Sequence, residues 1–438
     1  MTDIENRKML DSKYNSTFCI KPFTEICNTA NGGLKLCCQA SKTTVPPSEL
    51  NGSLAETFHT NANMIEIRRQ MQAGERVDAC LKCYRWEKST GTSPRHMYNM
   101  QMLEYDPEII DNAYTQPGYT QVKTLDIKFG NKCNLACVMC DPTNSSLIAL
   151  ERTKNNLPKS LDDSKMTNGK HIKQTHIEFS DDEFENIKKL APSIISIKST
   201  GGEPMLLPGF GKLLEYLVEN GYSKNIDFRT VTNGTVDSTQ WLHLMNQFKQ
   251  FKIAWSIDAV GESYNYICWP GKWSSVSEKH KRVMQSIQEN NYKNIIINFS
   301  IAISVFNVHQ CGDIIRYAHK LGINGSCDFN TVEDPEIMQP GLVSEQQMKD
   351  AIDDMLAASN DWQDAYPEND DFINYEVEGF ANMLSDNSEH NHNDPQRVQQ
   401  RLKLLKEITK YWQDVRKVSV SDYISNWDLT IGQLQDED

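Results

Sequence analysis

The chain has 438 residues, of which 39% are apolar and 24% charged, and its formal net charge at pH 7 is −14. This length predicts roughly two to three domains, and the composition is typical of a globular protein with a sizeable core. The acidic balance argues against a general nucleic-acid-binding surface, which needs a basic stripe. We see no apolar signal-peptide stretch at the start and no run long enough to span a bilayer, so a cytoplasmic location without membrane association is expected.

The first part of the chain, up to about residue 115, is rich in cysteine and in turn residues. The turn Asn31-Gly32-Gly33 predicts a hairpin between a strand after Pro22 and a returning strand over 34–38, because glycine accepts positive φ freely. A helix is expected over 62–73. Without an export signal, the twelve cysteines of the chain are expected to serve as metal or redox ligands rather than in disulfides.

Four cysteines of this part form a candidate closed metal site: Cys19, Cys37, Cys80 and Cys83. The predicted hairpin brings Cys19 and Cys37 toward the same end, and Cys80 and Cys83 form a C-x2-C knuckle. Four thiolates hold either a structural zinc ion or an iron–sulfur cluster. The residue types alone therefore leave zinc and iron–sulfur open.

From about residue 120 to 335, strand-like and helix-like runs alternate. Strands are expected over 125–129, 194–198, 226–231, 253–257, 295–304 and 327–331, and helices over 144–154, 182–190, 209–220, 239–249, 276–289 and 308–321. Six strands linked by helical crossovers predict an α/β fold with a parallel sheet. An open, partial (β/α)6 barrel fits best, with a doubly wound sheet as the alternative, and both bind ligands at the C-terminal ends of their strands.

Two segments outside this alternation are polar. Asn156–Gln174 is interpreted as a surface insertion, and Ser385–His390 as a solvated loop. From about residue 336 the chain is predicted to be a helical extension, in which the apolar periodicity of 398–415 indicates packing. The expected domains are 1–115, 116–335 and 336–438.

A cysteine loop follows the first strand of the alternating part. Cys133, Cys137 and Cys140 stand at C-x3-C-x2-C spacing directly after the strand over 125–129. Three thiolates on one short loop can hold three irons of a cubane [4Fe–4S] cluster and leave the fourth iron open to a small molecule. On spacing alone, three of the four ligands of a structural zinc site remain the alternative.

Polar residues also collect at the ends of later strands. The second strand ends in Gly201-Gly202-Glu203-Pro204, where the glycines let the backbone approach a ligand closely and Glu203 adds a carboxylate acceptor. Asn233 follows the third strand, and Ser256 and Asp258 end the fourth. The C-terminal ends of the strands of one sheet are thus expected to form a ligand site.

These motifs resemble those of the radical S-adenosylmethionine (SAM) superfamily over about residues 120–335, and the superfamily's partial barrel agrees with the strand count. The resemblance implies that Cys133, Cys137 and Cys140 bind a [4Fe–4S] cluster on which SAM is chelated. It further implies contacts to SAM from Met139, Gly201, Gly202, Glu203, Asn233, Ser256 and Asp258. Two positions depart from the pattern: Met139, where an aromatic residue is common, and Cys268, where related chains often carry arginine.

The upstream cysteines extend the resemblance. Cys19, Cys37, Cys80 and Cys83, with the following segment through Arg95, are similar to the twitch module, a short form of the SPASM module. In those relatives four such cysteines hold an auxiliary [4Fe–4S] cluster, which favours iron–sulfur over zinc here. A twitch module placed before the barrel resembles the N-terminal twitch-domain radical SAM proteins. The other cysteines form no second quartet, so one auxiliary cluster is expected.

The resemblance implies a radical SAM enzyme that cleaves SAM reductively to a 5′-deoxyadenosyl radical, which abstracts hydrogen from a substrate. The auxiliary cluster, with four cysteines, is interpreted as an electron relay. The expected partners are a peptide or small sugar-like metabolite as substrate and a flavodoxin- or ferredoxin-type reductant; no catalytic acid or base is assigned. The alternative is a non-catalytic iron–sulfur or zinc protein for electron transfer or scaffolding, against which the Gly-Gly-Glu-Pro motif argues.

Overall fold

The computed structural model describes residues 3–161, 178–365 and 372–434, so the predicted insertion over 156–174 lies mostly outside the described residues. By its internal contacts the chain divides into two compact units. The first unit comprises Met1–Gly130, Ile177–Arg229 and Gln247–Lys249, and the second comprises Asn131–His176, Thr230–Asn246 and Gln250–Asp438. The three domains expected from the sequence remain a prediction.

The strands form a mostly parallel sheet in the order β2-β1-β3-β4-β5-β6-β7-β8. They are β1 (Glu25–Asn28), β2 (Leu34–Lys35), β3 (Thr124–Lys128), β4 (Ser196–Thr200), β5 (Asp227–Thr232), β6 (Gln250–Ser256), β7 (Ile295–Ile303) and β8 (Cys327–Thr331). The six strands expected after residue 120 are present as β3 to β8, which confirms the α/β fold class. Their sequential order is that of a partial barrel and differs from a doubly wound sheet, in which the order reverses.

The predicted hairpin is present, and it joins this sheet. β1 pairs antiparallel with β2 and parallel with β3, so that Cys27 lies opposite Asp126. Gly32 adopts φ +89° in the turn, as the sequence predicted. The pairing of β1 with β3 was not predicted, because it joins segments far apart in the chain and leaves no local pattern.

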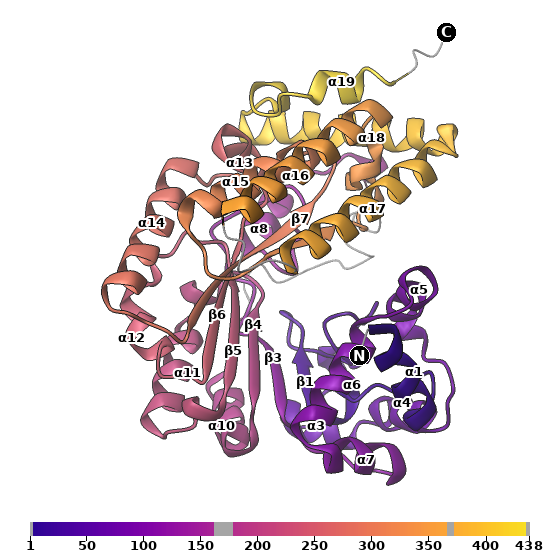
Figure 1. Cartoon of the computed structure of the whole chain (residues 1–438), viewed down its shortest axis with the longest axis vertical. Coiled ribbons are helices and arrows are strands. Elements are labelled where there is room, and N and C mark those ends of the chain that lie inside the picture. The colour runs from indigo at the N-terminus through magenta and orange to yellow at the C-terminus, as the bar shows by residue number, and fades with distance from the viewer. Residues whose placement is uncertain (1–2, 162–177, 366–371, 435–438) are drawn as a thin grey trace. The chain divides into compact units, whose positions relative to one another are not determined.

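The helices before β3 gather around β1, whereas α10 and α11 lie beside later strands (Figure 1). The helices of this unit are α1 (Asp3–Tyr14), α2 (Lys21–Thr24), α3 (Leu54–Thr60), α4 (Ala62–Gln72), α5 (Leu81–Thr90), α6 (Pro94–Tyr105), α7 (Pro107–Thr115), α10 (Asp181–Leu190) and α11 (Pro208–Glu219). The helix expected over 62–73 is α4, which Asn61 caps by accepting the backbone N–H groups of Asn63 and Met64. Tilted aromatic rings join the end of α1 to α2, with Phe18 5.7 Å from Tyr14 and 5.3 Å from Phe23 between ring centroids.

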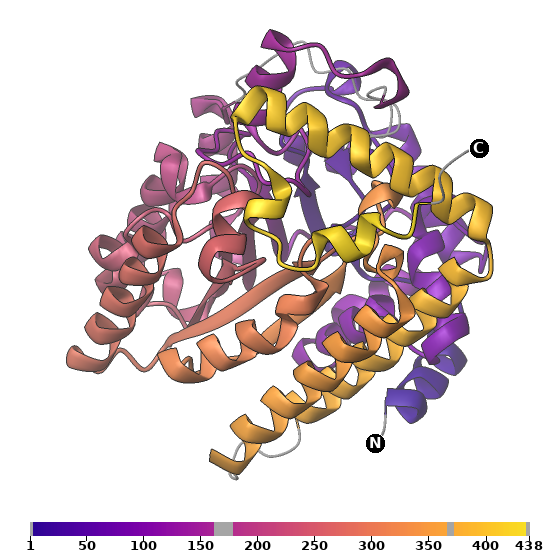
Figure 2. The same cartoon turned by 90° about the horizontal axis from the view of Figure 1, so that it is seen from above.

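The second unit holds longer helices. They are α8 (Ser146–Lys154), α12 (Leu242–Met245), α13 (Gly261–Ile267), α14 (Trp273–Glu289), α15 (Cys311–Leu321), α16 (Glu345–Ala365), α17 (Phe372–His392), α18 (Pro395–Arg416) and α19 (Trp427–Ile431). α16 packs against both α15 and α17, and Figure 2 shows α16 and α17 side by side in orange. None of the described helices has the length and apolar character needed to cross a membrane.

Two sequence-based interpretations are wrong in this unit. The loop expected over Ser385–His390 lies within α17, because Leu384 and Ser388, four residues apart, are both buried on one helical face. The helix expected over 239–249 is present as a 3-10 helix (Ser238–Trp241) that continues into α12, but it ends at Met245, and the chain enters β6 at Gln250. The periodicity of 398–415 is confirmed as α18, which buries Val398, Leu402, Leu405, Ile408 and Trp412.

Candidate metal centres

The predicted cysteine loop is fixed against the start of α8. Ser145 caps α8 by accepting the N–H of Ile148 at 3.3 Å, and its hydroxyl donates to the carbonyl of Leu135 at 2.7 Å. Ser146 donates its N–H to the carbonyl of Asn131 at 2.7 Å. The Ser146 hydroxyl accepts the N–H of Cys133 at 3.2 Å. The capping serines of α8 therefore hold the loop in place.

Cys133, Cys137 and Cys140 all remain partly exposed on this loop. The N–H of Leu135 donates to the Cys133 sulfur at 3.5 Å, and the N–H of Cys140 donates to the Cys137 carbonyl at 3.1 Å. Backbone N–H groups that point at thiolate sulfurs are a feature of iron–sulfur sites. Three cysteines on one short loop fit the ligand set of a cubane cluster with one open iron.

The segment after α13 pairs with this loop. The N–H of Ala136 donates to the carbonyl of Trp269 at 2.6 Å, and the N–H of Val138 donates to the carbonyl of Ile267 at 2.9 Å. These two bonds define an antiparallel arrangement in which Cys137 lies opposite Cys268. A hydrogen bond with the Cys268 sulfur raises the pKa of Cys137 well above its usual value. Cys268, a departure from the family pattern, is thus a neighbour of the predicted ligand Cys137.

Two of the residues expected to contact SAM lie near the loop. The Asn233 side-chain amide lies 3.8 Å from the Cys133 sulfur and donates to Oδ1 of Asn134 at 3.1 Å. Asp258 donates its backbone N–H to the Cys268 sulfur. Burial raises the pKa of the Asp258 carboxyl to about 6, and its Oδ1 accepts the N–H of Ala302 at 2.9 Å.

Met139 and Ser256 are the other expected SAM contacts in the second unit. Both are half-buried. Met139 lies on the cysteine loop itself, between the predicted ligands Cys137 and Cys140. Ser256 ends β6 and pairs with Ser300 of β7. Their contacts to SAM stay a prediction.

The Gly-Gly-Glu-Pro motif follows β4 in the first unit. Gly201 has φ +79° and Gly202 φ +57°, in the left-handed region that favours glycine. A Cβ on Gly201 would lie 2.7 Å from the side-chain Cγ of Lys128. Glu203 is fully buried, and its Oε1 accepts the N–H of Met205 at 3.1 Å. The left-handed backbone conformation therefore favours glycine at both Gly201 and Gly202. The Glu203 carboxylate stabilises the turn that follows them.

The four upstream cysteines line one cavity. Cys19 precedes α2, Cys37 follows β2, and Cys80 and Cys83 lie at the start of α5. Cys80 is half-buried and the other three are buried. Arg95 and Tyr98 of α6 line the same cavity. The structure thus brings together four residues that the sequence selected from separate segments, and their donor set fits a four-thiolate group.

Burial raises the pKa of all four thiols, for Cys19 to about 12, so a bound metal would have to replace their protons. Within the described residues, no three His, Cys, Asp or Glu side chains converge closely enough to hold a metal ion. A tetrahedral zinc site needs its sulfurs about 2.3 Å from one point. A cubane cluster instead binds one sulfur at each of four separate irons.

Arg416, at the end of α18, is a residue near the cysteine loop that sequence reasoning missed. Its guanidinium donates to Glu151 of α8 at 2.8 and 3.0 Å. It also lies over the ring of Trp269, 5.2 Å from the centroid, and its charge favours the thiolate of Cys137. The apolar periodicity of 398–415 predicted this helix. That pattern describes buried apolar positions and does not indicate a role for Arg416.

Comparison with known proteins agrees with the fold and the cysteine loop. Residues 127–318 match the family model of the radical SAM superfamily. This part of the chain is therefore a radical SAM domain, which favours an enzyme over the non-catalytic alternative. The family implies SAM and one [4Fe–4S] cluster. No protein of curated function matches the chain in sequence.

Several solved structures of radical SAM enzymes are similar to the chain. The methyltransferase TsrM from Kitasatospora setae, with cobalamin and a [4Fe–4S] cluster bound, shares 11% identity over 50% of this chain and 39% of its own length (TM-score 0.34). SuiB from Streptococcus suis bound to SAM shares 11% identity over 72% of this chain and 71% of its own (TM-score 0.36). SuiB bound to the precursor peptide SuiA shares 11% identity over 72% and 66% (TM-score 0.34).

Proposed function

We propose that this radical SAM enzyme carries an auxiliary [4Fe–4S] cluster and acts on a peptide or a small sugar-like metabolite. One observation carries the proposal: Cys19, Cys37, Cys80 and Cys83 line a single cavity, separate from the three-cysteine loop of the radical SAM domain. The substrate class rests on the resemblance to twitch and SPASM radical SAM proteins. A cytoplasmic location is part of the proposal and agrees with twelve cysteines that are all free thiols.

Cys133, Cys137 and Cys140 would hold the SAM-binding cluster, which when bound and reduced supplies the electron that cleaves SAM to a 5′-deoxyadenosyl radical. The chain's own part is to bind and orient. Asn233 positions the loop through Asn134 and the Cys133 sulfur. Gly201 and Gly202 keep the backbone open to the methionine end of SAM, and Met139, Glu203, Ser256 and Asp258 would supply further contacts.

Cys19, Cys37, Cys80 and Cys83 would hold the auxiliary cluster. With one thiolate for each of four irons, no iron is left to bind substrate directly. This ligand count supports an electron-relay role over substrate binding. A flavodoxin- or ferredoxin-type protein would supply the reducing electron.

The auxiliary site can be tested by counting metal. After anaerobic reconstitution, the natural chain is expected to hold about eight irons, and Cys80→Ser with Cys83→Ser about four, because one of two cubane clusters is lost. The double variant should still cleave SAM but should form no product once a substrate is known. Cys311→Ser is the matched control, since Cys311 is a buried free thiol on α15 and should leave the iron count unchanged. Zinc in the natural chain, or an unchanged iron count in the double variant, would contradict the proposal.

A further inference from the structure

A buried cation borders the cavity of the four upstream cysteines. Arg95, in the first turn of α6, lines this cavity together with Cys19, Cys80 and Cys83. Its side chain is only 2% exposed. A guanidinium in that position must find acceptors for its N–H groups, because an unpaired buried charge is costly.

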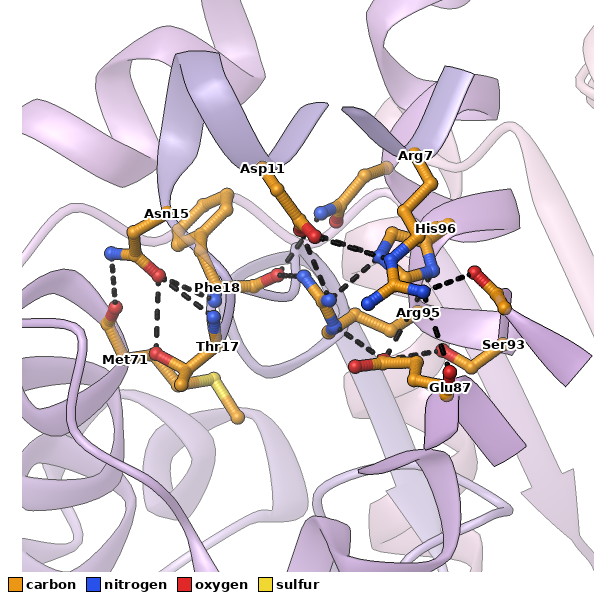
Figure 3. Close-up of polar contacts among 12 residues, drawn as sticks. Arg7, Asp11, Asn15, Thr17, Phe18, Met71, Glu87, Ser93, Arg95 and His96 are labelled. Carbon is orange, nitrogen blue, oxygen red and sulfur yellow. Dashed lines mark hydrogen bonds and ion pairs between the residues drawn. The ribbon is translucent and has the colours of Figure 1, made fainter. Parts of the chain in front are cut away.

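Figure 3 shows how Arg95 meets this requirement. Its Nε donates to Oε1 of Glu87 at 2.9 Å, and its Nη2 donates to Oδ1 of Asp11 at 3.1 Å and lies 2.6 Å from Nε2 of His96. Its Nη1 donates to the carbonyl of Phe18 at 3.1 Å. Among the described residues these contacts engage four of the five N–H groups that a guanidinium carries. Asp11 comes from α1 and Glu87 from α5, so Arg95 joins both helices to α6.

The same residue also acts on the cysteine sulfurs. Phe18, whose carbonyl Arg95 binds, directly precedes Cys19. The backbone N–H of Arg95 donates to the Cys83 sulfur, while the hydroxyl of Ser93 donates to Oε1 of Glu87 at 2.7 Å. The buried guanidinium of Arg95 thus lines the same cavity as the four cysteines and is held there by fixed acceptors.

We propose that Arg95 is a charge-compensating residue of the auxiliary [4Fe–4S] cluster, held in place by Asp11 and Glu87, and that it raises the reduction potential of that cluster. The inference rests on the proposed function, which supplies the cluster. Net charge, hydrogen bonds to sulfur and solvent exposure set the potential of such clusters. A fixed cation stabilises the reduced state, which carries one more negative charge, more than the oxidised state. A cluster tuned in this way accepts an electron more readily, as a relay must.

The test requires a full-length protein in which only the auxiliary cluster can form. A full-length background variant with Cys133→Ala, Cys137→Ala and Cys140→Ala removes the ligands of the SAM-binding cluster. Iron analysis and a redox titration followed by electron paramagnetic resonance then report only the auxiliary cluster. In this background, Arg95→Gln is expected to lower the midpoint potential, and Arg95→Lys to lower it less, because lysine keeps the charge but loses the fork of donors.

A second variant is expected to shift the midpoint potential in the opposite direction. Asp11→Asn removes a negative charge from the same network and is expected to raise the midpoint potential. The side-chain oxygen of asparagine can still accept from Nη2 of Arg95, so this change leaves no buried N–H group of Arg95 without an acceptor. Arg69→Gln is the matched control, because Arg69 is exposed, pairs with Glu66 and Glu75, and should leave the potential unchanged. A purely structural role of Arg95 would not produce opposite shifts.

The outcomes separate the two proposals. A background variant that binds no iron would overturn the auxiliary cluster and the role of Arg95 with it. About four irons with equal midpoint potentials in the background, Arg95→Gln and Asp11→Asn variants would overturn only the role of Arg95. If Arg95→Gln fails to fold, Asp11→Asn decides: a raised potential supports the inference, and an unchanged or lowered potential overturns it.

Discussion

His280 of α14 is a titratable residue whose environment makes a sharp prediction about pH. Its ring stacks on Trp255 with 4.1 Å between centroids, and its Nδ1 lies 3.1 Å from the Tyr317 hydroxyl. Burial, helped by the charge of Lys279, lowers its pKa to about 3. The unfolded chain takes up this proton near the usual value of about 6.5. The free energy of unfolding therefore falls as pH drops from about 6.5 toward 3, by about 1.4 kcal/mol per pH unit from this residue.

Replacing this residue should flatten that dependence. His280→Phe is expected to remove up to about 1.4 kcal/mol per pH unit from the slope of unfolding free energy against pH. Urea unfolding at several pH values between 4 and 6.5 measures it. His243→Gln is the control, because His243 is exposed and should keep the natural slope. Equal slopes in the His280 variant and the natural chain would show that His280 is not kept neutral by the fold.

At the scale of single residues, the sequence groups candidate ligands more readily than it reveals which residues lie next to them. Cys133, Cys137 and Cys140 could be assigned together because one short loop contains all three. Cys19, Cys37, Cys80 and Cys83 were grouped from a predicted hairpin and a C-x2-C knuckle, and all four line one cavity in the structure. The contact between Cys137 and Cys268 could not be predicted, because it depends on tertiary pairing with the segment after α13.

At the scale of elements, patterns that repeat locally were predicted correctly. β3 to β8 each contain buried apolar residues within a short run, and this is enough to locate a strand. The parallel pairing of β1 with β3 was missed because it is non-local. Part of α17 was predicted to be a loop because most of its residues there are polar. The structure nevertheless buries Leu384 and Ser388. Packing against α16 outweighs the polar composition there.

A buried ion pair joins α18 to α8, and its contribution to stability can be tested by mutation. The Arg416 and Glu151 side chains are 2% and 7% exposed, and their atoms approach to 2.8 Å. Arg416→Met leaves the Glu151 carboxylate buried without its partner and is expected to cost about 3–5 kcal/mol of unfolding free energy. Arg397→Met on the same helix breaks an exposed pair with Glu336 and should cost about 0–1 kcal/mol. Urea unfolding compares the two, and similar losses would contradict this account.

For the whole molecule, the division into two units matters for experiment. The first unit carries the four-cysteine cavity and the Gly-Gly-Glu-Pro motif, and the second carries the three-cysteine loop with Asn233 and Asp258. Each cysteine set therefore lies within one unit and can be removed without altering a ligand of the other.

The central claim is that the loop of Cys133, Cys137 and Cys140 makes this chain a SAM-cleaving enzyme. The direct measurement is the amount of 5′-deoxyadenosine released when the anaerobically reconstituted chain is incubated with SAM and dithionite. We predict release by the natural chain and by the Cys80→Ser, Cys83→Ser variant, and none by Cys137→Ala. A natural chain that binds about four or more irons but releases no 5′-deoxyadenosine, or a Cys137→Ala variant as active as the natural chain, would contradict it.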